Sequence, residues 1–263
     1  MLKRELKVNL KFFIIWLLIL VIMFLVVYLI YPYVITDEGM KDIDELLKVF
    51  PAEVLKAFNM DLESISTAFG WVKTEGFVFV LLAIGFYSST LGGTILLKEE
   101  DDKTIEYLNS LPITRSKIVT NKVIVGIIYI LLLILLFGLF NYIALTISED
   151  FSVKEFVLLS ITPIFIALPL FGINLFISTF LHKTKKTAGI CLGMVFIFYL
   201  LNMLSELSTK VEFLKYFSIY TLADVRNVIS TTSIDINMII ISLVITFVFI
   251  ILTYIRYNKK ELV

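Results

Sequence analysis

The sequence predicts an all-helical membrane protein with six membrane-spanning helices in a single domain, residues 1–263. Hydrophobic residues make up 59% of the chain and charged residues 17%, whereas soluble domains average about 45–50% and about 25%. The apolar residues fall in long blocks without charge, which is typical of membrane spans. Alternation with period two is absent, and this favours helices over a barrel.

Six blocks of the sequence contain no Asp, Glu, Lys, Arg or His. Crossing ~30 Å of hydrocarbon takes about 20 helical residues, and only the fifth block is clearly shorter. The first block is too long for a signal peptide, and no small-residue cleavage site follows it. Pro163 and Pro169 predict a bend in the fourth span. The predicted spans are residues 12–31, 76–97, 123–147, 157–181, 188–204 and 236–255.

The basic residues predict the orientation of the spans. One set of polar segments carries 15 of the 23 Lys and Arg residues: residues 1–11, 98–122, 182–187 and 256–263. The opposite set is longer and carries 16 of the 23 acidic residues. The first set and both termini are therefore expected in the cytoplasm. The formal net charge of zero gives no indication of a nucleic-acid partner, and the single cysteine, Cys191, excludes an intrachain disulfide.

The longest of the expected cytoplasmic segments, between the second and third spans, has the pattern of two short helices. Asp101 or Asp102 is suited to cap a first helix over residues 104–111. Pro112 ends that helix, because the residue before a proline avoids the α region. Thr114 is suited to cap a second helix that leads into the third span.

The first of these helices is amphipathic, with Ile105, Leu108 and Leu111 on one side. Five acidic residues accompany it, on the side of the membrane where anionic lipid repels them. Those acids are Glu99, Glu100, Asp101, Asp102 and Glu106. An amphipathic helix held away from the lipid by acidic charge indicates a surface for a protein partner.

The stretch "LLKEEDDKTIEYLNSLPITRSKIVTNK" resembles the cytoplasmic loop of ABC-2 type transporter permeases. The residues that fit the family pattern are Thr104, Glu106, Leu108, Leu111, Pro112, Thr114, Arg115 and Lys122. Lys103 stands where the family usually has glycine. "KRELKVNLKFFIIW" is similar to the amphipathic N-terminal helix that leads into the first span of these permeases, and "VFPAEVLKAFNMDLESIS" is similar to the outer segment of one branch.

The resemblance implies a fold and a function. Residues 99–122, called here the docking loop, would contain a coupling helix that lies in a groove of a separate cytoplasmic ABC ATPase. Short re-entrant or interfacial helices would lie between the last two spans. Such permeases work in pairs, so a second copy or a paralogue is an expected partner. The ATPase-coupling residues implied are Glu100, Thr104, Ile105, Glu106, Leu108, Leu111, Pro112 and Arg115.

The chain has no G-x-x-x-x-G-K phosphate loop. The sequence therefore predicts that it is not itself an enzyme and binds no cofactor or metal, and that ATP and magnesium are bound by the partner ATPase. The resemblance implies an ATP-driven exporter in the plasma membrane of a bacterium or archaeon. Apolar spans that are rich in aromatic residues suit a hydrophobic or amphipathic substrate such as a drug, a peptide or a lipid.

Two other classes of function are weighed against this one. A non-transporting immunity or sensor protein of the same fold would use the docking loop only for binding a partner. An intramembrane enzyme is disfavoured, because the spans lack the histidines and acids that such sites and proton relays require. The single histidine, His182, is expected to be an ordinary residue at the end of a span.

Small residues recur with a spacing of four, which places them on one face of a helix. They are Gly85, Ser89 and Gly93 in the second span and Gly189 and Gly193 in the fifth. Such faces let two helix backbones approach closely. The sequence leaves open whether they pack within the subunit, form a dimer seam or line a substrate path.

The distribution of charge gives a testable topology. Cysteines placed near Met1 and Val263 should be inaccessible to a membrane-impermeant thiol reagent on whole cells, whereas cysteines at Glu45 and Lys210 should be labelled. Labelling from outside near Val263 would contradict the six-span arrangement.

Overall fold

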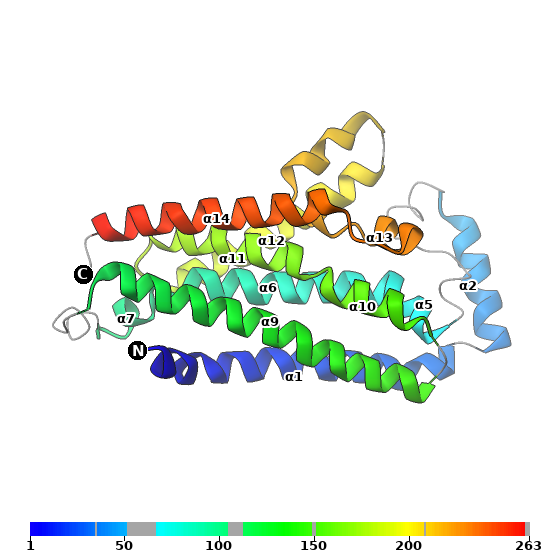
Figure 1. Ribbon diagram of the computed structural model, residues 1–263. Coiled ribbons are helices and arrows are strands. Elements are labelled where there is room, and N and C mark those ends of the chain that lie inside the picture. Colours follow the sequence, from blue (N-terminus) through cyan, green and yellow to red (C-terminus); the bar gives the residue numbers. More distant parts are fainter. Residues whose placement is uncertain (35, 52–66, 105–112, 149–150, 208, 261–263) are drawn as a thin grey trace.

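The computed structural model describes residues 1–34, 36–51, 67–104, 113–148, 151–207 and 209–260. Among these residues, six helical segments are long and apolar enough to cross a membrane: Leu2–Tyr33, Phe77–Ile95, Arg115–Ile147, Val153–Ser178, Thr184–Leu207 and Ile236–Lys259. The six predicted spans are thus confirmed, and the chain is a multi-pass membrane protein. The long helices run side by side, and both ends of the chain lie at one end of the bundle, called here the terminal end (Figure 1).

The predicted N-terminal amphipathic segment and the first span form one continuous helix. Helix α1 runs without interruption over Leu2–Val34 and so includes the N-terminal residues. No Gly or Pro occurs before Pro32, so nothing in the sequence breaks the helix earlier. The fifth span is also longer than its charge-free block, because α12 covers Thr184–Leu207.

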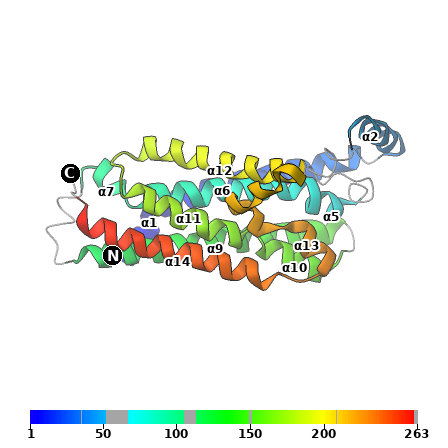
Figure 2. The ribbon, with the colours of Figure 1, turned by 90° about the horizontal axis from the view of Figure 1, so that it is seen from above.

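The centre of the bundle is formed by α6 (Phe77–Ile95) and α11 (Ile164–Ser178). In the most apolar windows, 61% of the second span and 67% of the fourth are buried, against 17% of the first, fifth and sixth. Helix α11 packs on both α6 and α14 (Ile236–Lys259), and α12 packs on α6. Figure 2 shows α11 between α12 and α14.

Two spans contain irregular segments at the far end of the bundle, away from the termini. The second span is preceded by α5 (Ala68–Trp71) and by η1, a π-helix over Val72–Gly76. The fourth span is interrupted between α10 (Val153–Ile161) and α11, at Thr162 and Pro163. The interruption lies at Pro163, where a bend is predicted, whereas Pro169 lies inside α11.

The remaining described elements are short. Helix α2 (Asp37–Val49) follows the first span. Between α12 and α14 lie η2 (Thr209–Phe217), η3 (Ile219–Ala223) and α13 (Val225–Thr231). Helix η3 is buried against α11, α12 and α14. The re-entrant or interfacial position of these helices in a membrane stays a prediction.

Helix α7 (Lys98–Asp101) overlaps the start of the docking loop, and Asp102 is its C-cap residue. The first helix predicted there, over residues 104–111, lies outside the described residues except for Thr104. Lys103 then adopts a φ of 56°, the left-handed conformation that glycine enters without steric cost. A glycine, which the family resemblance leads us to expect at this position, would adopt this conformation without strain. At the end of the loop, the Thr114 hydroxyl accepts a hydrogen bond from the amide of Lys117 at 3.3 Å, and α9 follows over Arg115–Ser148.

Candidate functional site

The clearest polar feature of the bundle is a cluster of charges at the terminal end, where α7 joins the docking loop to the spans. Its centre is Lys122 on α9, whose exposed fraction is 0%. The Lys122 ammonium donates to Glu99 Oε2 on α7 at 2.7 Å and to Glu5 Oε2 on α1 at 3.2 Å. Its third hydrogen bond, at 2.6 Å, goes to the carbonyl of Ile95 at the end of α6. One ammonium group therefore ties together four elements and uses all three of its N–H donors.

A second cation supports the same side of the cluster. The Lys98 ammonium on α7 donates to Asn9 Oδ1 at 2.7 Å and to the carbonyl of Val8 at 3.4 Å, both on α1. The Asn9 amide in turn donates to the carbonyl of Glu5 at 2.9 Å. Burial lowers the pKa of Lys98, and the nearby charge of Lys122 lowers it further, against the opposing effect of the carboxylates.

Glu100, the next residue of α7, faces a different set of elements. Its Oε1 accepts a hydrogen bond from Lys260 Nζ at 2.7 Å, just beyond α14, and its Oε2 lies 2.9 Å from Nδ1 of His182. Lys260 also donates to the carbonyl of Leu181 at 2.6 Å. Glu100 is 6% exposed, so this carboxylate is satisfied inside the protein. Burial lowers the pKa of Lys260, while its pairing with Glu100 opposes that shift.

Arg115, at the other end of the docking loop, holds the end of the last span. Its guanidinium donates to the carbonyls of Tyr257, Asn258 and Lys260 at 3.5, 3.1 and 2.7 Å. The last carbonyls of a helix have no partner within the helix and carry its partial negative charge, so a cation is stabilising there. Asp101 on α7 accepts a further hydrogen bond from the hydroxyl of Thr184. Through these contacts both ends of the docking loop are fixed to the spans.

These positions give two of the five acids of the docking loop a different explanation from the one the sequence indicates. Glu99 and Glu100 are buried and pair with cations of the same chain. They are therefore not part of an exposed acidic surface. Asp101 and Asp102 are exposed, and Glu106 lies outside the described residues.

The other residues of the predicted coupling set are distributed as follows. Thr104 is exposed and Arg115 is half-buried. Ile105, Leu108, Leu111 and Pro112 lie outside the described residues, so the amphipathic face of the coupling helix stays a prediction.

The small residues of the second and fifth spans lie in different surroundings. A Cβ atom on Gly85 would come within 2.3 Å of the Tyr220 hydroxyl, and one on Gly93 within 2.2 Å of Cys191 Sγ. Ser89 donates to the carbonyl of Cys191 at 3.1 Å. The face of α6 that carries these residues therefore meets α12 and η3 within the subunit. Gly189 and Gly193 are exposed, and an added Cβ atom on either would meet nothing within 4 Å.

Sequence reasoning did not identify the partners of the two buried glutamates. Glu5 and Lys260 look like ordinary flanking charges of a span, and His182 was expected to be an unremarkable loop residue. The sequence did contain one signal for these partners. Glu99 and Glu100 lie just after the charge-free block 76–97, where unpaired acids are costly. Among the described residues, no group of three or more His, Cys, Asp or Glu side chains could hold a metal ion. The buried charges of the cluster are paired with one another.

Comparison with known proteins gives one match. The model of a protein family described as ABC-2 family transporter protein matches residues 1–262. No curated protein and no solved structure matches the chain.

The cluster gives a prediction for stability. Replacing Lys122 by Met leaves Glu99 and Glu5 buried without their cation, which should lower the free energy of unfolding in mixed micelles by about 3–5 kcal/mol. Lys117→Met is the matched control, because Lys117 lies on the same helix and is exposed. The control should change stability by about 0.5 kcal/mol or less. Equal, small losses in both variants would mean that the cluster is not a source of stability.

Proposed function

Because the chain belongs to the ABC-2 family of transporter proteins and is a membrane permease component without an ATPase domain, we propose that it couples ATP hydrolysis by a separate subunit to export. The ATPase docks on the docking loop, residues 99–122. The observation that carries this proposal is the attachment of the loop to the spans by α7, which bonds to α1, α9, α12 and Lys260 beyond α14, and by Arg115, which bonds to the end of α14.

The charge cluster couples movement of the docking loop to movement of the ends of the spans. Separating Glu99 from Lys122, or Glu100 from Lys260, would leave a buried charge without its partner, at a cost of about 3–5 kcal/mol. A movement of the loop that leaves these pairs intact must carry the ends of the spans with it. When ATP closes the ATPase dimer, the docking loop moves and the spans open a path outward.

The remaining features of the proposal follow from composition and family. Both termini and the docking loop lie in the cytoplasm of a prokaryotic cell, the spans lie in the plasma membrane, and the substrate is hydrophobic or amphipathic. The partners are an ABC ATPase and a second permease, either a copy or a paralogue. ATP and magnesium belong to the ATPase, because this chain has no phosphate loop.

One experiment separates export from a purely binding role. The permease and its ATPase are reconstituted in inverted vesicles, and candidate amphipathic compounds are added outside. Export requires that one compound stimulates ATP hydrolysis and accumulates inside the vesicles. An immunity or sensor protein of the same fold would bind the compound and its partner, with no accumulation.

The outward face of α12 is the part of the surface proposed for contact with the second permease. Gly189 and Gly193 lie on it with open space around them, and Phe196 and Leu200 are exposed farther along the helix. A glycine face permits close approach of a second backbone, and no described residue of the subunit lies within 4 Å of a Cβ atom placed on either glycine.

The docking loop is tested by a change in its apolar face. Leu108→Asp should abolish copurification of the ATPase while insertion and abundance of the permease stay normal, because losing a buried apolar anchor costs on the order of 2 kcal/mol or more. Copurification from detergent measures binding, and accumulation in vesicles measures transport.

Arg115→Ala is the comparison for that variant. It removes the contacts to the end of α14, so ATPase binding should persist while coupling weakens and becomes sensitive to salt. If the loop served only to orient the protein in the membrane, Leu108 would be irrelevant and the basic residues would matter. A Leu108→Asp permease that still binds its ATPase and transports therefore refutes the docking assignment.

The outward face of α12 is tested by Gly193→Leu. The larger side chain should separate two permeases and lower the dimer content measured by mass in detergent, without lowering the melting temperature of the monomer. Gly93→Leu is the contrast, because its side chain would enter the space of Cys191 Sγ and should destabilise the monomer itself. Unchanged dimer content in Gly193→Leu would mean that this face meets lipid.

A further inference from the structure

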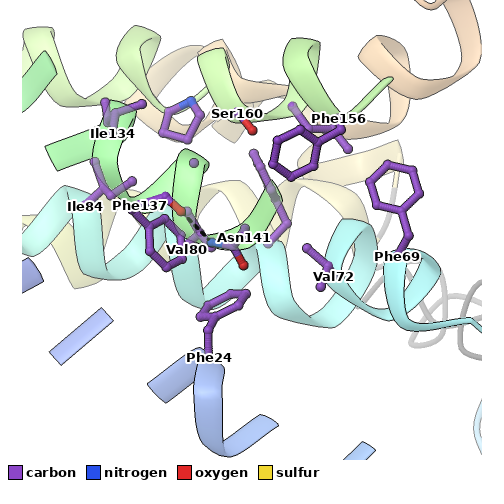
Figure 3. A pocket seen from close by; sticks show the side chains of 14 residues that line it. Phe24, Phe69, Val72, Val80, Ile84, Ile134, Phe137, Asn141, Phe156 and Ser160 are labelled. Atoms are coloured by element: carbon purple, nitrogen blue, oxygen red, sulfur yellow. Dashed lines mark hydrogen bonds between the residues drawn. The ribbon is translucent and has the colours of Figure 1, made fainter. Parts of the chain in front are cut away.

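A pocket lies between the spans toward the far end of the bundle. The empty space within it, its open side included, is about 450 Å³. Figure 3 shows side chains from several helices turned toward it. Five phenylalanines from α1, α5, α6, α9 and α10 dominate its lining: Phe24, Phe69, Phe77, Phe137 and Phe156.

The pocket borders both irregular segments of the spans. Val72, the first residue of the π-helix η1, lines one side, and Pro163, at the break of the fourth span, lines another. π-Helical turns are rare and occur frequently at functional sites. A proline removes a backbone donor from the helix and commonly marks a kink, and here the α-helix is interrupted between α10 and α11 at Pro163. Two independent departures from regular helix therefore meet at one cavity.

The pocket has two polar groups with unused hydrogen-bonding capacity. Asn141 Oδ1 accepts from the Tyr28 hydroxyl at 2.8 Å, and Asn141 Nδ2 donates to the carbonyl of Phe137 at 2.9 Å. Since an amide has two N–H groups, one N–H remains without a partner among the described residues. The Ser160 hydroxyl on α10 also has no hydrogen-bond partner within the described part of the chain, although a helical serine commonly bonds to a carbonyl one turn earlier.

We propose that this pocket binds the apolar part of a small neutral amphipathic molecule, whose single hydroxyl or carbonyl group bonds to Ser160 and Asn141. None of the described residues that line the pocket is ionisable, so a charged group inside it would be costly. Five aromatic rings suit an alkyl chain or a ring of the ligand. The inference names a substrate class and so rests on the proposed function, but binding itself does not need the ATPase.

Binding is measured on the full permease in phosphatidylcholine vesicles with a photoreactive octanol that carries a diazirine on its alkyl chain. Adducts on the segment that contains Phe137 and Phe156 should saturate with concentration and should be displaced by unlabelled octanol. Adducts on the exposed face of α14 report contact with lipid and should do neither. Failure of the pocket adducts to saturate would overturn the proposal.

Three variants separate pocket binding from general damage. Ser160→Phe fills the pocket and should abolish the saturable adducts, whereas Ile161→Phe adds the same ring at the neighbouring exposed position and should leave them unchanged. Ser160→Ala removes only the hydroxyl and should weaken apparent affinity about 5-fold. Because Ser160→Ala keeps the pocket open, it tests the proposal even if Ser160→Phe does not fold. Unchanged affinity in Ser160→Ala would overturn the assigned hydrogen bond.

The same apolar chemistry could come from a membrane lipid, and native mass spectrometry distinguishes the two sources. A phospholipid that stays bound to the wild-type chain, is lost in Ser160→Phe and resists displacement by octanol would overturn the role in substrate binding. The result is independent of the docking loop. A permease that binds its ATPase through residues 99–122 but not octanol refutes only the pocket, and the opposite pattern refutes only the proposed function.

Discussion

The organisation of the terminal end depends on the ammonium group of Lys122. A fully buried lysine is costly unless it is paired and all of its donors are used, and here two carboxylates and a backbone carbonyl surround it. These acceptors come from α1, α7 and the end of α6. If the first three spans separated at this end, a buried charge would be exposed to solvent or left without its partner. The cost of desolvation thus becomes a geometric constraint on how the spans can move.

The adjacent glutamates of α7 extend this constraint to the rest of the bundle. Glu99 faces Lys122, whereas Glu100 faces Lys260 and His182 beside the last three spans. The contacts between the middles of the spans are of a different kind. There the backbones approach through small residues, as at Gly92, where an added Cβ atom would lie 2.4 Å from the Phe171 carbonyl oxygen. Apolar contacts are non-directional, so displacement along such surfaces costs less than breaking a buried ion pair.

The parts of the fold that depend on local sequence were predictable, and the parts that depend on long-range partners were not. Charge-free blocks identified the six spans, Pro163 the break in the fourth, and Thr114 the start of α9. That α1 is one continuous helix was not evident from the charge pattern, because its charged first turns lie outside the charge-free block. The partners of Glu99 and Glu100 lie as far as 160 residues away along the chain. A spacing of four identifies a glycine face but not the element that packs on it, so the sequence does not distinguish Gly93 from Gly193. In the structure Gly93 packs against Cys191, whereas no described residue contacts a Cβ atom placed on Gly193.

Helix α6 links the charged terminal end to the aromatic pocket. It is followed almost directly by α7 and preceded directly by the π-helix η1, and its 19 residues span about 28 Å at the helical rise. Most of its apolar window is buried, and close packing against α11 makes it resist bending. A displacement of α7 would therefore reach η1 mainly as movement of a rigid rod. The π-helix and the break at Pro163 are the segments beside the pocket whose backbone geometry departs from the regular α-helix, so we expect such a movement to change the shape of the pocket before that of the regular helices around it.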